Sequence, residues 1–410
     1  MGKLSIIRLV FILTSLLMSL LTVVYWENLV WIYSGVMPVL YGPLHSGWST
    51  RTNKDPSQPV STSRSETSIP TSKPDTTLIP VQQYKEGEQR EEEELKEEQK
   101  ESSAVSAEDM EQRVRKQRIM DVCSEMSSSK KFPKLTRPFD QIPNDELSHF
   151  IVDDVHRIIY CYIPKVACSN WKKVMMVLTG FSKPGGKPYT DPLQIPSPVA
   201  HKHSHELAFK RFPQLYGSHA RQMMKDKLKN YTTFMFVRDP LVRLISAFRS
   251  KFIRPDPEFY KNYGKKLMRT YGHVSDLPDT VQKAHAAGLK PKFQQFIAYL
   301  VDPKNRRQLF NEHWLQMYRL CHPCQVKYDF IGRLETIGTD AEQVLKLMKV
   351  DHLVQLPSAY TNFTEASWVR DWYEPIPTEV RRELYKLYEP DFKLFGYPKP
   401  DIVGDEETTP

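Results

Sequence analysis

The chain has few cysteines and lacks the motifs that would fix its class at once. Its 410 residues include only five cysteines, too few for a disulfide scaffold. Cys321-His322-Pro323-Cys324 has no second CxxC and no suitably spaced pair of histidines, which argues against zinc. No internal repeat and no cluster of metal ligands stands out, so no metal is expected.

The charge is unevenly distributed along the chain. The net charge is +8, yet residues 85–101 hold nine Glu against four Lys and Arg, a local charge of −5. The remainder therefore carries about +13, by subtraction of −5 from +8. A basic globular part favours polyanionic partners such as nucleic acid, acidic glycans or nucleotide phosphates.

The N-terminus predicts a membrane anchor. Lys3 and Arg8 precede residues 9–26, an uncharged apolar run that ends in Tyr25-Trp26. A run of this length can cross a thin bilayer, with the aromatic pair at the headgroups and the basic residues in the cytosol. A cleaved signal peptide is the alternative, weakened by the long apolar core and by the lack of a small-x-small site after it.

Composition then divides the part of the chain after the apolar run, which we expect to lie in the lumen. Ser, Thr and Pro dominate from about Gly42 to Pro80, and the acidic run follows. Such segments bury too little apolar surface to offset their ordering entropy. We expect a cytosolic tail at 1–8, an anchor at 9–26, a largely disordered stem at 27–120, a catalytic domain at 121–400 and a flexible tail at 401–410.

The globular part predicts an α/β fold with a central parallel sheet flanked by helices. Continuous apolar runs, typical of parallel strands covered on both faces, occur at 157–163, 232–237 and 328–334. Helical patterns follow at 293–301, at 340–350 with Thr339 as the cap, and at 378–388. Strands that alternate with helices favour a layered α/β architecture.

The first of two candidate anion-binding segments follows the run at 157–163. Pro164 ends the strand, and a helix is predicted from Asn170 to Leu178. Backbone N–H groups and the positive end of the helix dipole would converge there on an anion beside Lys165. No glycine flanks Lys165, so the nucleotide-kinase motif is absent and ATP with magnesium is disfavoured. An ordinary strand-loop-helix corner is the alternative.

The second segment follows the run at 232–237. Arg238 leaves the strand, Asp239 can cap the next helix, and Pro240 suits its first turn. Ligands of open α/β sheets bind beyond the carboxyl ends of the strands, where Arg238 and Ser246 could clamp a phosphate. A simple helix-capping Arg-Asp pair is the alternative.

Together the two segments resemble the nucleotide-binding boxes of Golgi carbohydrate sulfotransferases, in the group of the HNK-1 and chondroitin/dermatan 4-O-sulfotransferases. Residues 310–314, 321–324, 328–332 and 395–397 support the resemblance in the same order, which covers roughly 144–400. It implies a P-loop-like sulfotransferase fold and the donor 3′-phosphoadenosine 5′-phosphosulfate (PAPS), with 3′-phosphoadenosine 5′-phosphate as product. The first box would bind the phosphosulfate, with Lys165 as the catalytic cation: Pro164, Lys165, Val166, Ala167, Cys168, Ser169, Asn170. The second would bind the 3′-phosphate, through Arg238 and Ser246 within Arg238, Asp239, Pro240, Leu241, Val242, Arg243, Leu244, Ile245, Ser246.

The general base stays open between several residues. His313, beside Glu312, is the first choice, since a sugar hydroxyl attacks best when its proton is accepted. Packing of His313 against Trp314 is the structural alternative, and Glu312 and the cluster His201, His203 and His205 are the other candidates.

The oxidising lumen affects the cysteines and the sequons. A structural disulfide is predicted within Cys321–Cys324, or from this pair to Cys123 or Cys161, with Cys168 as the free thiol. The odd number also leaves a linked pair of chains, and hence a homo-oligomer, open. Asn230 and Asn362 are predicted glycosylation sites.

The resemblance implies sulfation of the 4-hydroxyl of N-acetylgalactosamine in chondroitin and desulfated dermatan at the Golgi membrane, with no nucleic-acid partner. Other acceptors in the same class are terminal N-acetylgalactosamine on N-glycans and the glucuronic acid 3-hydroxyl of the HNK-1 epitope. A membrane-anchored glycan-binding protein without activity is the alternative from a different class.

Overall fold

The computed structural model describes residues 109–127, 132–306, 310–358 and 367–404. All of them belong to the second of the two units into which the chain divides, Pro80–Pro410. The expected anchor, the stem up to residue 108, Asn362 and the end of the tail lie outside the described residues. Among the residues described, none forms a helix of the length and apolarity that crossing a bilayer requires.

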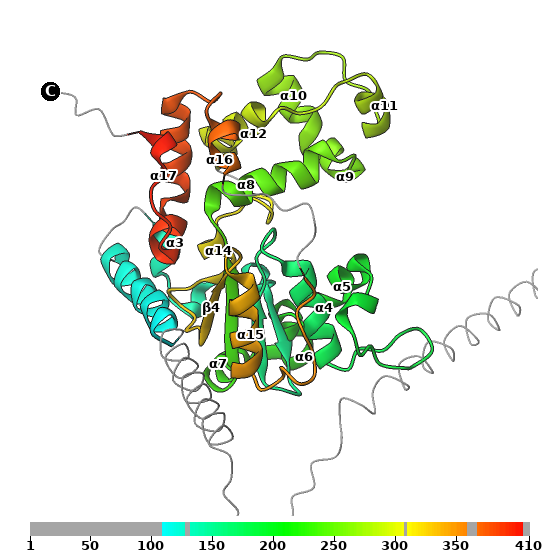
Figure 1. Ribbon diagram of the computed structural model, residues 1–410, viewed down its shortest axis with the longest axis vertical. Helices are drawn as coiled ribbons and strands as arrows, with labels where there is room; N and C mark the ends of the chain where they lie inside the picture. Colours follow the sequence, from blue (N-terminus) through cyan, green and yellow to red (C-terminus); the bar gives the residue numbers. More distant parts are fainter. Residues whose placement is uncertain (1–108, 128–131, 307–309, 359–366, 405–410) are drawn as a thin grey trace, which may run out of the picture. The chain divides into compact units, whose positions relative to one another are not determined.

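The centre of the fold is a four-stranded sheet (Figure 1). Its strands follow the order β1 (Phe150–Asp153), β2 (Ile158–Cys161), β3 (Thr232–Val237) and β4 (Phe330–Arg333). β2, β3 and β4 are parallel, as the sequence predicted, and β3 has the predicted bounds. β1 was not predicted, and it pairs antiparallel with β2 because a short turn joins the two as a hairpin.

The helices fall between and after the strands. α4 (Cys168–Leu178) follows β2, α8 (Pro240–Phe248) follows β3, and α15 (Ile337–Leu347) follows β4. Besides a helix over residues 109–127, further α-helices in the described part of the chain are α3 (Pro133–Thr136), α5 (Ser197–Ser204), α6 (Phe212–Tyr216), α7 (Ala220–Asn230), α10 (Lys265–Gly272), α11 (Val281–Ala286), α12 (Phe293–Val301), α13 (Pro303–Arg306), α14 (Met317–Cys321), α16 (Trp368–Tyr373) and α17 (Thr378–Phe395).

Three predicted helices have different bounds from those expected. α4 begins at Cys168 rather than Asn170, and α15 begins at Ile337, so Thr339 lies inside the helix and does not cap it. α17 continues past Tyr388 and through Pro390 to Phe395. Its last turns are held by Asp391, which is fully buried and accepts hydrogen bonds from the backbone N–H groups of Met317 and Tyr318 at 2.7 and 2.9 Å. Tertiary contacts therefore extend a helix that local propensity would end.

Aromatic packing joins α4 to the sheet. The fully buried Trp171 of α4 lies 4.9 Å from Phe234 and 5.0 Å from Phe236, between ring centroids. On β4, a Cβ added to Gly332 would lie 2.3 Å from the ring of Phe236, so only glycine fits beside it. The start of α4, which carries the first candidate segment, is thus fixed to the strands.

A helix over residues 109–127 covers the outer side of β4. The side-chain amide of Gln112 accepts from the backbone N–H of Ile331 at 3.0 Å and donates to its carbonyl at 3.2 Å, as a neighbouring strand would. Arg115 donates to the same carbonyl at 2.7 Å and to Asp340 of α15 at 2.8 Å. Residues 109–120, expected to belong to the stem, therefore pack on the sheet.

Two disulfides link the helix over residues 109–127 and strand β2 to the segment Cys321–Cys324. Cys123 pairs with Cys324, and Cys161 pairs with Cys321, with Cα–Cα distances of 5.6 and 5.8 Å. The predicted pairing with Cys123 and Cys161 is confirmed, whereas the alternative bond within Cys321–Cys324 does not form. Cys168 is the free cysteine, as expected.

Candidate active site

The first candidate segment forms a strained turn between β2 and α4. Lys165 and Ala167 both have left-handed backbones, with φ of 71° and 51°. Ala167 precedes the helix, and its carbonyl accepts hydrogen bonds from the N–H groups of Asn170 and Trp171. Strain of this kind in residues other than glycine is concentrated at functional sites. Arg157, His273, His322 and Lys349 also have positive φ, so the strain by itself does not distinguish a site from an ordinary corner.

The second candidate segment lies directly beside the first. Asp239 caps α8 by accepting from the N–H groups of Leu241 and Val242 at 2.8 and 2.9 Å, which confirms its predicted capping role. Arg238 turns away from this cap, and its guanidinium donates to the carbonyl of Lys165 at 3.2 Å. The carboxyl ends of β2 and β3 therefore bring the two segments into contact.

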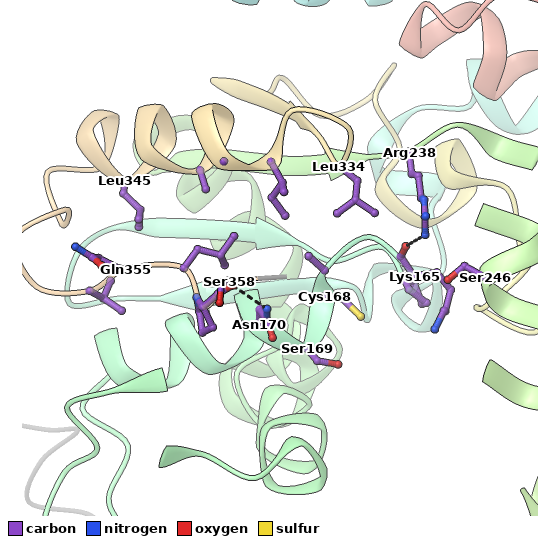
Figure 2. A pocket seen from close by; sticks show the side chains of 18 of the residues that line it. Lys165, Cys168, Ser169, Asn170, Arg238, Ser246, Leu334, Leu345, Gln355 and Ser358 are labelled. Atoms are coloured by element: carbon purple, nitrogen blue, oxygen red, sulfur yellow. Dashed lines mark hydrogen bonds between the residues drawn. The ribbon is translucent and has the colours of Figure 1, made fainter. Parts of the chain in front are cut away.

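Both segments line one cavity of about 850 Å³ (Figure 2). Lys165, Arg238 and Ser246 lie at one end of the view, Leu345 and Gln355 lie at the other, and Ser169 and Asn170 lie between them. The predicted residues that line the cavity are Pro164, Lys165, Ala167, Cys168, Ser169, Asn170, Arg238, Ser246 and His313. A volume of this size suits a nucleotide-sized ligand.

The remaining predicted residues lie behind the lining. Val166 belongs to the core, and the apolar residues of α8 from Leu241 to Ile245 pack inward. Arg243, also buried, donates to the carbonyls of Pro164 at 3.0 Å, Leu315 at 2.7 Å and Glu312 at 2.9 Å. It connects the lysine turn to the segment that carries His313.

The end of the cavity near Lys165 is cationic. Burial and, to a smaller extent, the charges of Lys251, Arg238 and Arg254 lower the pKa of Lys165 to about 8, against an opposing effect of Cys168. Burial likewise lowers the pKa of Arg238 to about 10. A bound anion would offset this mutual repulsion, so the site favours an anionic ligand.

His313 faces the same cavity as Lys165. Its Nδ1 lies 2.7 Å from the amide oxygen of Asn311, which can only accept, so Nδ1 carries the proton. Nε2 then keeps its lone pair, and burial lowers the pKa of His313 to about 2, which keeps the ring neutral. Its ring packs edge-on against Phe259, at 5.4 Å between centroids.

The other candidate bases have different surroundings. Glu312 lies outside the cavity lining, 3.4 Å from the hydroxyl of Tyr162 and 3.5 Å from Nε2 of His149. His201 lines the cavity, whereas His203 pairs with Glu206 at 3.0 Å and His205 is exposed beyond the end of α5.

The opposite wall of the cavity was not predicted. Residues of α15 and of the segment 351–358 form it, together with Leu334 just before the helix. Its apolar members are Leu334, Ile337, Ala341, Leu345, Val354 and Leu356, and Glu342, Lys346 and Asp351 line it as well. The side chain of Asn170 donates to the carbonyl of Pro357 at 3.1 Å and so ties the lysine turn to this wall. The amphipathic pattern of α15 predicted burial, but it could not indicate that part of the apolar face would border a cavity.

Two further polar residues of the cavity lie outside the two predicted boxes. Ser250 and Lys251 line the cavity from the π-helical turn Arg249–Ile253 after α8. The spacing of Arg238 and Ser246 indicated the start of α8 alone, and nothing in the sequence marked a widened turn after it.

Asn230, the predicted glycosylation site within the described residues, is exposed at the end of α7.

Comparisons with known proteins agree with this geometry. The family model described as "Sulfotransferase family" matches residues 148–398. The chain belongs to this family.

Carbohydrate sulfotransferases are among the relatives of this sulfotransferase. Carbohydrate sulfotransferase 12 of Xenopus laevis is 51% identical over 300 residues, covering 73% of this chain and 71% of the relative. Its counterpart in Mus musculus is 52% identical over 72% and 70% of the two chains. Carbohydrate sulfotransferase 11 of Rattus norvegicus is 37% identical over 71% and 77%. No solved structure matches the chain.

The predicted likeness to the chondroitin 4-O-sulfotransferase group is thereby confirmed. The chain is an enzyme that transfers sulfate to a carbohydrate, and the alternative of a non-catalytic glycan-binding protein is set aside.

Proposed function

We propose that the enzyme transfers sulfate from PAPS to the 4-hydroxyl of N-acetylgalactosamine in chondroitin and desulfated dermatan. The observation that carries the proposal is the single cavity in which Lys165, Arg238 and His313 meet. A dianionic or more highly charged donor, a cation beside its reacting end and a neutral base are the requirements of this reaction, and these residues supply the last two.

Both anionic groups of PAPS would lie at the cationic end of the cavity, and its purine would lie toward the apolar end. Lys165, Ser169 and the N–H groups at the start of α4 would hold the phosphosulfate, since a helix start and an ammonium both favour anions. Arg238 and Ser246 would hold the 3′-phosphate, and the apolar side of α15 would receive the purine. PAPS, when bound, supplies an activated sulfuryl group.

The residues then divide the chemistry between them. Lys165 stabilises the charge that grows on the bridging oxygen as the S–O bond breaks. Nε2 of His313 would accept the proton of the sugar hydroxyl once the bound anionic donor offsets the charges of Lys251 and Lys165, which help to lower the pKa of this histidine. The transfer depends mainly on positioning and electrostatics, as phosphoryl transfer does.

Two observations support chondroitin as the acceptor. The relatives are named carbohydrate sulfotransferases, and the sequence motifs resemble the chondroitin 4-O group. Lys251 at the cavity and exposed lysines elsewhere on the surface, such as Lys266 of α10, would attract an acidic polysaccharide. Terminal N-acetylgalactosamine and the HNK-1 epitope stay as alternative acceptors.

We further propose that the enzyme is a single-pass Golgi protein with a luminal catalytic domain. The apolar run at 9–26 and the basic residues before it support this orientation. Protease protection of the catalytic domain in sealed microsomes would test it, and digestion without detergent would contradict it.

The acceptor is tested by incubating the full chain with PAPS labelled with ³⁵S and a panel of acceptors. Chondroitin should take up label that chondroitinase releases as a 4-sulfated disaccharide. Label found only on N-glycans or on the HNK-1 trisaccharide would replace chondroitin as the acceptor. Absence of transfer to every acceptor would refute the proposed reaction.

A further inference from the structure

A hydrogen-bonded chain of three side chains ends at the cavity. Ser169 and Lys172 belong to the first turns of α4, and His201 belongs to α5, which packs against α4. Nε2 of His201 lies 2.9 Å from the hydroxyl oxygen of Ser169. Nδ1 of the same ring lies 3.5 Å from the ammonium of Lys172. Of the three, Ser169 and His201 line the cavity, whereas Lys172 is buried behind them.

The surroundings of Lys172 keep its charge close to His201. The ammonium lies 3.5 Å from the centre of the Tyr162 ring, a cation–π contact, and the side chain is only 2% exposed. Burial lowers the pKa of Lys172, while Cys168 and Glu312 raise it. The ring of Tyr162 and the charge of Glu312 therefore stabilise the ammonium form.

The position of this ammonium decides which nitrogen of His201 carries the proton. An ammonium can only donate, and its charge disfavours a second N–H at Nδ1, so the proton lies on Nε2. Burial and Lys172 lower the pKa of His201 to about 4, so a second proton is not bound near neutral pH. His201 therefore donates from Nε2 to the oxygen of Ser169.

The proton on Nε2 of His201 determines how the hydroxyl of Ser169 is oriented. Because its oxygen accepts from His201, its own hydrogen is directed away from that bond. Ser169 lines the cavity beside Cys168 and Asn170 (Figure 2), so the hydrogen can be donated to a ligand there. A hydroxyl polarised in this way is a stronger donor than an isolated one.

We propose that Lys172 and His201 are positioning residues that fix Ser169 as a hydrogen-bond donor to the anionic end of the sulfate donor. The inference rests on the proposed function, because it takes PAPS as the ligand of this cavity. It also separates the roles of two histidines. Both ring nitrogens of His201 are engaged, whereas only Nδ1 of His313 is engaged among the described residues, so of these two histidines only His313 has a nitrogen that can accept a proton from the sugar.

A double-mutant cycle on the full chain tests the proposal, with kcat/KM for PAPS as the readout. Ser169→Ala and His201→Leu should each lower kcat/KM about tenfold, the effect of losing one charge-assisted hydrogen bond. The double variant should be no worse than either single variant, because His201 acts only through Ser169. Losses that multiply in the double variant, or no loss in Ser169→Ala, would overturn the proposal.

Two further variants distinguish positioning from general support of the fold. His201→Gln should recover most of the activity, because its amide N–H can still donate to Ser169. Lys172→Met should lower kcat/KM, whereas Lys202→Met, at an exposed position of α5, should not. Failure of His201→Gln to recover activity, with a melting temperature like that of the wild type, would also overturn the proposal. If wild type transfers no sulfate, the proposed function fails together with this inference; if wild type is active and the losses multiply, only the inference fails.

Discussion

The two walls of the cavity differ in what builds them. One wall consists of the Lys165 turn and α8, which carry buried cations, hydroxyls and a strained backbone. The other consists of α15 and residues 351–358, and it presents mainly aliphatic side chains on α15. The first wall can act on charge as it develops during the reaction, whereas the aliphatic side chains of the second can contribute only affinity. Substitutions in the two walls should therefore change different kinetic constants.

The largest effect is expected in the polar wall. Lys165→Ala removes the cation beside the breaking bond and should lower kcat by about 10²–10³, the usual cost of one transition-state contact. Steady-state kinetics with labelled PAPS measure it. Lys187→Ala, at an exposed position after α4, is the matched control and should leave kcat unchanged. A normal kcat in Lys165→Ala would show that the polar wall has no catalytic role.

The helix over residues 109–127 should support the other wall. Arg115→Met would leave the carboxylate of Asp340 in α15 without its buried cation, although the N–H of Arg333 and the hydroxyl of Thr336 still donate to it, at a cost of about 3 kcal/mol in the free energy of unfolding. Urea denaturation measures this loss, and the KM for PAPS should rise as α15 loosens. Arg113→Met removes only an exposed contact and serves as the control. Equal stability of the two variants would show that the helix does not brace α15.

A smaller effect is expected in the apolar wall itself. Ile337→Ala removes aliphatic surface that faces the cavity and should raise the KM for PAPS about tenfold, from about 1–2 kcal/mol of lost burial, with kcat unchanged. Leu347→Ala, 49% exposed on the same helix, is the control. A fall in kcat instead of a rise in KM would remove the distinction between the walls.

The mildest test changes only pH. Donor binding favours the ammonium of Lys165, whose pKa in the empty cavity is about 8, so affinity should fall as pH rises through 8. The loss approaches tenfold per pH unit. Binding titrations of 3′-phosphoadenosine 5′-phosphate between pH 7 and 9.5 measure it. Lys165→Ala should lose this dependence, and its persistence in that variant would assign it to another group.

The same contrast explains what the sequence could predict. The polar wall was predictable because Pro164, Lys165 and Arg238 each follow a buried apolar strand, and parallel strands bring their carboxyl ends together. The cap at Asp239 and the free thiol of Cys168 followed from equally local signals. These features depend on neighbours in the chain.

The parts that escaped prediction depend on tertiary contacts. Ile337 and Leu345 have the same pattern as any core-facing helix, and only the fold leaves a cavity beside them. The hydrogen bonds of Arg243 to Pro164, Glu312 and Leu315 span residues far apart in the chain. The general base could not be chosen from sequence for the same reason. The hydrogen bond of His313 to Asn311 fixes the proton on Nδ1, but only the fold places this ring in the same cavity as Lys165.

Calorimetric titration of 3′-phosphoadenosine 5′-phosphate into the full chain is the sharpest test of whether one cavity holds the sulfate donor. We expect one site per chain, and we expect Arg238→Met to weaken the affinity about 10- to 100-fold by loss of a charged hydrogen bond. Lys187→Ala should bind as wild type does. No binding by wild type, or unchanged affinity in a folded Arg238→Met, would contradict the account.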